Sequence, residues 1–248
     1  MEEKKITLHS YGDLALAHLS QLVGQNEQVL ESLKNELVEL VLAKKFLFVF
    51  GSGHSAILPL ELYHRAGGPS FVIPMVADYL LPTAGPPVVR LFERLPQSAQ
   101  PLLNRLDPQP GEMIWLMSQS GINAAGVDLA LEAKKRNLKT VAFTSRAHSS
   151  GVPSRHPSGK KLFEVCDWVV DLKGAIGDAA LRVSNEVSVG PLSSLSAIFL
   201  AHSVLSAVIA ECTERGMLCS YTSVNTPEGE LKNQTLEAQA KIRDPLLR

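Results

Sequence analysis

Three short segments of the chain combine hydroxyl side chains, mostly with glycine, directly after apolar runs. Gly51–Ser55 reads Gly-Ser-Gly-His-Ser, Ser118–Gly121 reads Ser-Gln-Ser-Gly, and Thr144 and Ser145 form the third segment. Hydroxyl groups and backbone amides that no bulky side chain covers are suited to donating several hydrogen bonds to a phosphate group. The chemistry that these segments predict is therefore recognition of a phosphorylated ligand.

The elements that must position these segments are buried strands. Phe46–Phe50, Met113–Met117 and Thr140–Phe143 are short, mainly apolar runs, typical of strands covered on both faces of a parallel sheet. Helical patterns at Ala56–Gly68 and Gly121–Asn137 follow the first two. Ligands of open α/β sheets bind beyond the carboxyl ends of the strands. We therefore expect the three hydroxyl-rich segments to converge at one edge of the sheet.

The remaining pattern completes an α/β fold. Phe71–Met75 predicts a second strand, with Pro74 favouring an edge position, and Trp168–Leu172 predicts the last strand. Tyr11–Ala43 has leucines at helical spacing, with an interruption expected near Gly24–Asn26. Strands that alternate with helices imply right-handed crossovers and a parallel sheet.

Three further segments receive simpler interpretations. Pro82–Pro110 contains seven prolines and predicts short helices and loops, and Thr235–Ile242 predicts a short helix. Leu192–Ala210 has no charged residue when His202 is neutral, and five serines interrupt it. We expect a buried helix there, with a membrane span as the less favoured alternative.

Composition limits the classes of function. The chain has 248 residues, an apolar fraction of 45% and a formal net charge of −1, which suits one domain and gives no reason to expect nucleic acid or an anionic membrane as a partner. The start of the sequence, MEEKKITLHS, lacks the apolar core of a signal peptide. Cys166, Cys212 and Cys219 have no metal-type spacing. We expect a cytoplasmic protein with reduced thiols.

These motifs resemble the SIS (sugar isomerase) domain superfamily. Within it, the chain is similar to single-domain proteins described as phosphosugar-binding or phosphoheptose-isomerase-like. The stretches that carry the resemblance lie between residues 10 and 220 and are FGSGHS (Phe50–Ser55), ELYHRAGG (Glu61–Gly68), SQSGINA (Ser118–Ala124), EAKKRNLKTVAFTS (Glu132–Ser145), VPSRHPSGKKLFEVCD (Val152–Asp167) and GDAAL (Gly177–Leu181).

The resemblance implies a flavodoxin-like, three-layer fold with a five-stranded parallel sheet of order 2-1-3-4-5 and an additional N-terminal helix. We expect the chain to divide into an N-terminal helical segment (1–44), the SIS domain (45–222) and a C-terminal tail (223–248). It also implies a homodimer or homotetramer with sites near the subunit boundaries. The ligand would be a sugar phosphate, and no cofactor is expected.

The resemblance also assigns the binding residues. The second and third segments would hold the phosphate, and the first would border the sugar. These substrate-binding candidates are Gly51, Ser52, Gly53, Ser55, Ser118, Gln119, Ser120, Gly121, Thr144 and Ser145. Glu61 and Arg65 stand where zinc-dependent phosphoheptose isomerases carry a His and a Glu, so we expect no metal site.

Two residues near the first segment are candidates for catalysis. Aldose–ketose isomerisation needs a base that moves a proton between C1 and C2, and Glu61 could supply it from the helix after that segment. The alternative is that Glu61 only pairs with Arg65, four residues later. His54 could assist ring opening, or it could simply cap the helix.

Other polar residues have both a functional and a structural interpretation. Four basic residues in the loop after the fourth strand could fold over a phosphate or remain on a solvated surface. Asp178 could contact sugar hydroxyls, although an N-cap of a helix over Ala179–Leu181 is favoured. His202 is interpreted as a buried or interface histidine rather than a catalyst. The four basic residues are Arg155, His156, Lys160 and Lys161.

Two other functions compete with an isomerase. Gly51-x-Gly53-x-x-Ala56 also fits the dinucleotide-binding pattern, and Asp78 follows the second strand where a ribose-binding acid is found. That pattern does not explain the hydroxyl groups after the third and fourth strands. A non-catalytic phosphosugar sensor that acts through a protein partner is the other alternative.

Overall fold

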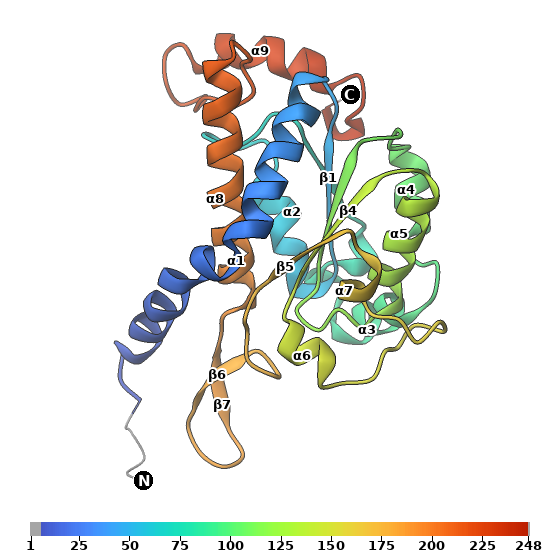
Figure 1. Ribbon diagram of the computed structural model, residues 1–248, viewed down its shortest axis with the longest axis vertical. Helices are drawn as coiled ribbons and strands as arrows, with labels where there is room; N and C mark the ends of the chain where they lie inside the picture. The colour runs from blue at the N-terminus through green and yellow to red at the C-terminus, as the bar shows by residue number, and fades with distance from the viewer. Residues whose placement is uncertain (1–5, 248) are drawn as a thin grey trace.

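The computed structural model describes residues 6–247 and has a five-stranded parallel sheet at its centre (Figure 1). The strand order is β2-β1-β3-β4-β5, which confirms the order implied by the resemblance and the α/β class expected from the strand and helix pattern. β2 lies at one edge of the sheet. Pro74 favours this position because proline has no N–H to donate to a second neighbouring strand. The strands are β1 (Leu47–Gly51), β2 (Val72–Met75), β3 (Met113–Met117), β4 (Lys139–Thr144) and β5 (Trp168–Asp171).

Helices cover both faces of the sheet because successive strand residues point to opposite sides. Leu47 and Val49 pack in a core with α1 and α8, whereas Phe48 and Phe50 pack in a second core with α4 and α5. Both cores are apolar, which explains the uninterrupted apolar runs of the sequence. The helices are α1 (Ser10–Leu42), α2 (Ile57–Leu62), α3 (Pro86–Arg94), α4 (Gln100–Leu106), α5 (Ala124–Lys135), α6 (Arg146–Ser150), α7 (Leu162–Val165), α8 (Ser193–Glu214) and α9 (Gly229–Ala240).

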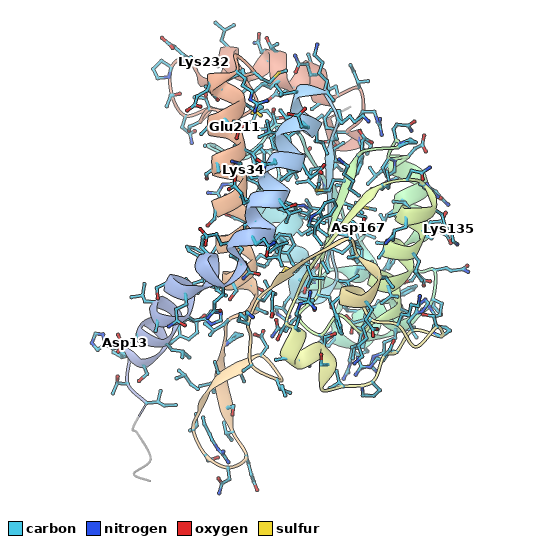
Figure 2. All side chains as sticks on the ribbon, in the orientation of Figure 1. Asp13, Lys34, Lys135, Asp167, Glu211 and Lys232 are labelled. Carbon is cyan, nitrogen blue, oxygen red and sulfur yellow. The ribbon has the colours of Figure 1, made fainter. Side chains whose placement is uncertain are left out.

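α1 and α8 pack against each other along much of their length (Figure 1). The Lys34 ammonium of α1 lies 3.4 Å from the Glu211 carboxylate of α8, and both side chains are labelled in Figure 2. Among residues 6–247, α8 is the one helix long and apolar enough to cross a membrane. Leu200 and Val208 of this helix are completely buried in one of the two cores, whereas Ser206 and Ala207 are exposed, so α8 buries one face and only part of the expected burial is observed.

α1 continues through Gly24–Asn26, so the interruption expected there is wrong. The Asn26 side chain is buried and bonds to the backbone of Asp171 in β5, which holds this turn against the sheet. A polar residue that seemed to interrupt the helical stripe is therefore a packing contact.

The helix expected over Ala56–Gly68 is shorter in the structure. A 3₁₀ turn at Gly53–Ala56 precedes α2, which ends at Leu62. Gly67 and Gly68 instead exchange backbone hydrogen bonds with Tyr221, at 2.8 and 3.0 Å. These bonds draw the chain away from the helix before β2 begins.

The segment after β5 also differs from expectation. Ala179–Arg182 is strand β6, which pairs antiparallel with β7 (Ser188–Pro191), and the expected short helix is absent. The hairpin projects from the body of the molecule beside the N-terminal part of α1 (Figure 1). The loop expected after the fourth strand contains α6, and α9 begins six residues before the expected helix at Thr235.

Candidate functional site

The candidate site lies between β1 and β3, where the order in which the chain adds strands to the sheet changes direction. The chain passes from β1 to β2 on one side and then to β3 on the other, which leaves a crevice between the carboxyl ends of β1 and β3. Ligands of doubly wound sheets bind at this position. The backbone N–H of Ser145 donates to the Gln119 carbonyl at 3.1 Å, and Gly51 is paired with Met117. The three hydroxyl-rich segments therefore converge, as predicted.

A cavity of about 510 Å³ opens at this edge, and we call it the carboxyl-edge cavity. Its volume falls within the range of small-molecule sites. Three apolar residues, Ile122, Val152 and Pro153, form the rest of the wall. The polar residues that line it are Ser52, Ser55, Glu93, Ser118, Gln119, Ser120, Asn123, His148, Arg155 and Asp178.

The Ser118–Gly121 loop is folded tightly against the strand ends. Gly121 has φ +61°, and a Cβ there would lie 2.8 Å from Oγ1 of Thr144, so only glycine fits. The Ser118 hydroxyl accepts a hydrogen bond from the Gly121 N–H at 3.1 Å. The hydroxyls of Ser120 and Ser55 have no hydrogen-bond partner among the described residues, so both remain available to a ligand.

Thr144 and Ser145 lie beneath the cavity and are completely buried. The Thr144 hydroxyl donates to the Gln119 carbonyl at 3.2 Å. The Ser145 hydroxyl donates to the Gly174 carbonyl at 2.7 Å and accepts from the His148 N–H at 3.2 Å, which caps α6. Both residues support the loops that form the cavity and do not line it themselves.

Glu61 is engaged elsewhere and is not among the residues that line the cavity. Its carboxylate forms an ion pair with Arg65 and lies 3.3 Å from Nε2 of His202 in α8. The pairing with Arg65 is the structural alternative considered for this residue. His54 is exposed in the 3₁₀ turn and does not line the cavity either. The catalytic assignment of both residues stays a prediction.

Two other ionisable side chains, Glu93 and His148, line the cavity. The Ser52 hydroxyl donates to Oε2 of Glu93 at 3.4 Å, and that oxygen lies 4.0 Å from where a Cβ would stand on Gly53. Glu93 thus reaches from α3 over the first segment. His148 lines the cavity from α6. Sequence reasoning missed Glu93 because it lies in the proline-rich segment, far from any motif.

The other charged residues of the site are held in fixed places. Nη1 of Arg155 donates to the Asn123 side chain at 3.0 Å, and the Arg155 N–H donates to Ile122 at 2.9 Å. The Asp178 carboxylate accepts from the N–H groups of Leu192 and Ser193 at 3.2 and 2.9 Å. Asp178 is therefore a helix cap, but of α8 rather than of the helix expected directly after it.

The remaining basic residues of the loop do not line the cavity. His156 pairs with Asp128 at 2.9 Å, and Nζ of Lys161 donates to the Ser149 carbonyl at 2.6 Å. Of the four basic residues suggested by the sequence, only Arg155 lines the cavity. Among residues 6–247, no group of three or more His, Cys, Asp or Glu side chains is arranged to hold a metal ion.

A family model described as the SIS domain matches residues 10–145, more than half of the chain. The chain belongs to the SIS domain family. This SIS protein is 35% identical to the UPF0309 protein of Geobacillus kaustophilus over 232 residues, 93% of this chain and 92% of that one. It is 31% identical to that of Shouchella clausii over 226 residues, 90% and 92% of the two chains.

Two solved phosphoheptose isomerases have a similar fold. The Francisella tularensis structure has a TM-score of 0.54 at 14% identity, and the match covers 81% of this chain and 95% of that one. The Neisseria gonorrhoeae structure has a TM-score of 0.50 at 14% identity, covering 82% and 100%. The observed strand order also differs from the order 3-2-1-4-5-6 of dinucleotide-binding folds, which disfavours the NAD alternative for this SIS domain.

Proposed function

We propose that this SIS-domain protein binds a sugar phosphate in the carboxyl-edge cavity and interconverts its aldose and ketose forms. The observation that carries the proposal is the pairing, in one cavity, of unpartnered hydroxyls with two ionisable groups that can exchange protons. Family membership supports phosphosugar binding, and the two phosphoheptose isomerases of similar fold favour isomerisation over other chemistry.

The phosphate would lie against the Ser118–Gly121 loop. The Ser120 hydroxyl is available there, and the Arg155 guanidinium, which the Asn123 side chain holds next to the loop, supplies a positive charge. Hydrogen bonds to a dianion are stronger than those between neutral groups. The sugar would then extend toward Ser52 and Ser55, beside the Glu93 carboxylate.

Glu93 is the group best suited to act as the base. Of the two carboxylates that line the cavity, Asp178 is occupied by two backbone N–H groups, whereas Glu93 accepts only from the Ser52 hydroxyl. Glu93 would take the C2 proton of the aldose while O1 receives a proton from His148, which gives the enediol. His148 would then take the O2 proton as Glu93 returns its proton to C1, which gives the ketose.

The test begins with binding. Sugar phosphates should raise the melting temperature, and the corresponding free sugars should not, because stabilisation follows affinity. Glucose and glucose 6-phosphate provide the first matched pair for this comparison. Equal stabilisation by both would refute phosphate recognition.

The second measurement separates catalysis from sensing. Each sugar phosphate that binds is incubated with the protein in deuterated water, and exchange of the C2 proton is followed by NMR. Exchange together with formation of the isomer supports the isomerase. Binding without exchange for every ligand in the panel would reject the isomerase and leave a phosphosugar sensor.

A further inference from the structure

A second cavity lies at the opposite edge of the sheet, and we call it the amino-edge cavity. It has a volume of about 480 Å³. Phe46, Phe71 and Glu112 line it, and these residues immediately precede β1, β2 and β3. α9 closes the cavity from the far side, and it lies across the ends of α1 and α8 at the top of Figure 1. Its distance along the strands from the carboxyl edge makes it independent of the proposed sugar phosphate site.

The walls of the amino-edge cavity are mainly apolar. Phe71 and Leu236 are buried, and Phe46 and Met217 extend the same surface. Leu218 lines the cavity as well, yet 57% of its surface is exposed. A concave apolar surface of this size, with a few polar groups, is typical of a small-molecule site rather than of a sugar site.

Positive charge is in excess around the cavity. Glu112 is 2% exposed, and its carboxylate accepts from the N–H groups of Phe46 and Gln109 and from Arg243, at 3.1, 2.6 and 3.1 Å. Glu112 and Arg243 therefore compensate each other within the protein. Lys44 and Lys45 remain, and no carboxylate among the described residues pairs with either.

The two lysines are held at the cavity by the turn between α1 and β1. Lys44 adopts φ +55°, and Nζ of Lys45 donates to the neutral carbonyl of Pro110 at 3.0 Å. A ligand that places an apolar body among the phenylalanine and leucine side chains can thus bring an anionic group to the part of the wall that these two lysines line. An amphipathic anion provides both the apolar body and the anionic group.

We propose that the amino-edge cavity binds a small amphipathic carboxylate, with an aliphatic or aromatic body and a single anionic group. The apolar body removes the cavity walls from water. The lysines distinguish the carboxylate from a neutral molecule of the same shape. This site would give the protein a second ligand, chemically unrelated to a sugar phosphate.

Decanoate below its micelle concentration tests the proposal, with decanol as the neutral counterpart and 1-anilinonaphthalene-8-sulfonate as the fluorescent reporter. We expect saturable binding of one reporter molecule per chain and its displacement by decanoate. Decanol should displace it about tenfold less well, since two lysines favour the anion. Glucose 6-phosphate should not displace it.

Leu218→Trp and Leu231→Trp form a matched pair of variants. Both leucines are exposed, so both variants should fold, but only Leu218 lines the cavity. Leu218→Trp should narrow the mouth and weaken decanoate binding about tenfold, and Leu231→Trp should leave it unchanged. The double variant Lys44→Glu/Lys45→Glu should weaken decanoate binding and preserve decanol binding.

Three results would overturn the proposal. The first is equal decanoate affinity in Leu218→Trp and Leu231→Trp, which would locate binding elsewhere. The second is the absence of saturable binding of either anion by the wild-type protein. The third is loss of reporter binding as the protein concentration rises and dimers form. That result would identify a second copy of the chain as the occupant of the amino-edge cavity.

Discussion

The Asn26 side chain pairs with the backbone of Asp171 in the same way that a neighbouring strand would. Its Nδ2 donates to the Asp171 carbonyl at 3.0 Å, and its Oδ1 accepts from the Asp171 N–H at 2.9 Å. β5 is an edge strand, and edge strands expose unpaired backbone groups. A side chain of α1 thus closes the edge at the residue where β5 ends and ties the N-terminal helix to the sheet.

Asn26→Ala should destabilise the protein by about 1–3 kcal/mol, because it leaves a buried N–H and carbonyl of Asp171 without partners. Urea unfolding would measure the change. Gln25→Ala is the matched control, since Gln25 is the exposed neighbour in the same helix. A loss of stability as large in the control as in Asn26→Ala would show that helix propensity, and not the pairing with Asp171, is responsible.

Glu93→Gln should reduce the rate of C2 proton exchange by about 10²–10⁴, the usual contribution of a general base, with ligand binding nearly retained. Glu61→Gln is the comparison, because Glu61 is the base suggested by the sequence. We expect it to retain exchange. NMR in deuterated water measures both. The opposite result, with exchange lost only in Glu61→Gln, would return the role of base to Glu61.

Ser120→Ala should weaken sugar phosphate binding by about 1.5–3 kcal/mol, the value of a hydrogen bond to a charged group. Titration calorimetry would measure it, and stability should not change because the Ser120 hydroxyl has no partner among the described residues. Ser145→Ala should instead lower the stability of the protein more than its affinity for the sugar phosphate. It removes bonds to Gly174 and His148 beneath the cavity, so its main effect should be on the free energy of unfolding. An equal effect of both variants on affinity alone would contradict this division of roles.

The stability of the protein should depend on pH through His202. Burial, with the cation of Arg65 nearby, lowers the pKa of His202 below its ordinary 6.5. The adjacent Glu61 carboxylate does not reverse this direction because Arg65 already pairs with it. The unfolded chain therefore binds a proton more readily than the folded protein does, and stability decreases as the pH falls through 6.5.

His202→Gln isolates this effect. The difference in free energy of unfolding between the wild type and the variant should be constant above about pH 8 and should change as the pH falls toward the pKa of the folded state. Urea unfolding at a series of pH values measures it. A difference that stays constant from pH 5 to pH 8 would disprove the lowered pKa.

The exposed apolar residues of α1 and of the β6–β7 hairpin lead us to expect self-association. Leu16 of α1 and Val187 and Val189 of the hairpin are exposed, and these two elements project together (Figure 1). Exposed apolar side chains gathered on neighbouring elements are typical of subunit interfaces. We expect at least a dimer by sedimentation at micromolar concentration, and Leu16→Glu should dissociate it. Leu231→Glu, on α9, is the control and should remain associated.

The sequence by itself determined the sheet and the edge at which the hydroxyl-rich segments meet. Each strand of the sheet is a short, mainly apolar run, and the glycines and serines after Phe50 and Met117 identify the carboxyl ends of β1 and β3. Those signals are local, because burial on both faces and a tight turn each constrain a few adjacent residues. They were sufficient to predict the α/β class and the convergence of Ser52, Ser55 and Ser118–Ser120.

Only the tertiary structure decided which charged groups reach the site. Glu93 lines the cavity although it follows Ser55 by 38 residues. It lies on α3, in the connection between β2 and β3, and no local sequence pattern predicts the path of that connection. Glu61 is near the first segment in sequence, but Arg65 and His202 hold it, and His202 belongs to α8. Thr144 and Ser145 have the right chemistry for a ligand, yet the loops folded over them bury both hydroxyls. Burial and distant pairing depend on how elements pack, and that information is spread over the whole chain.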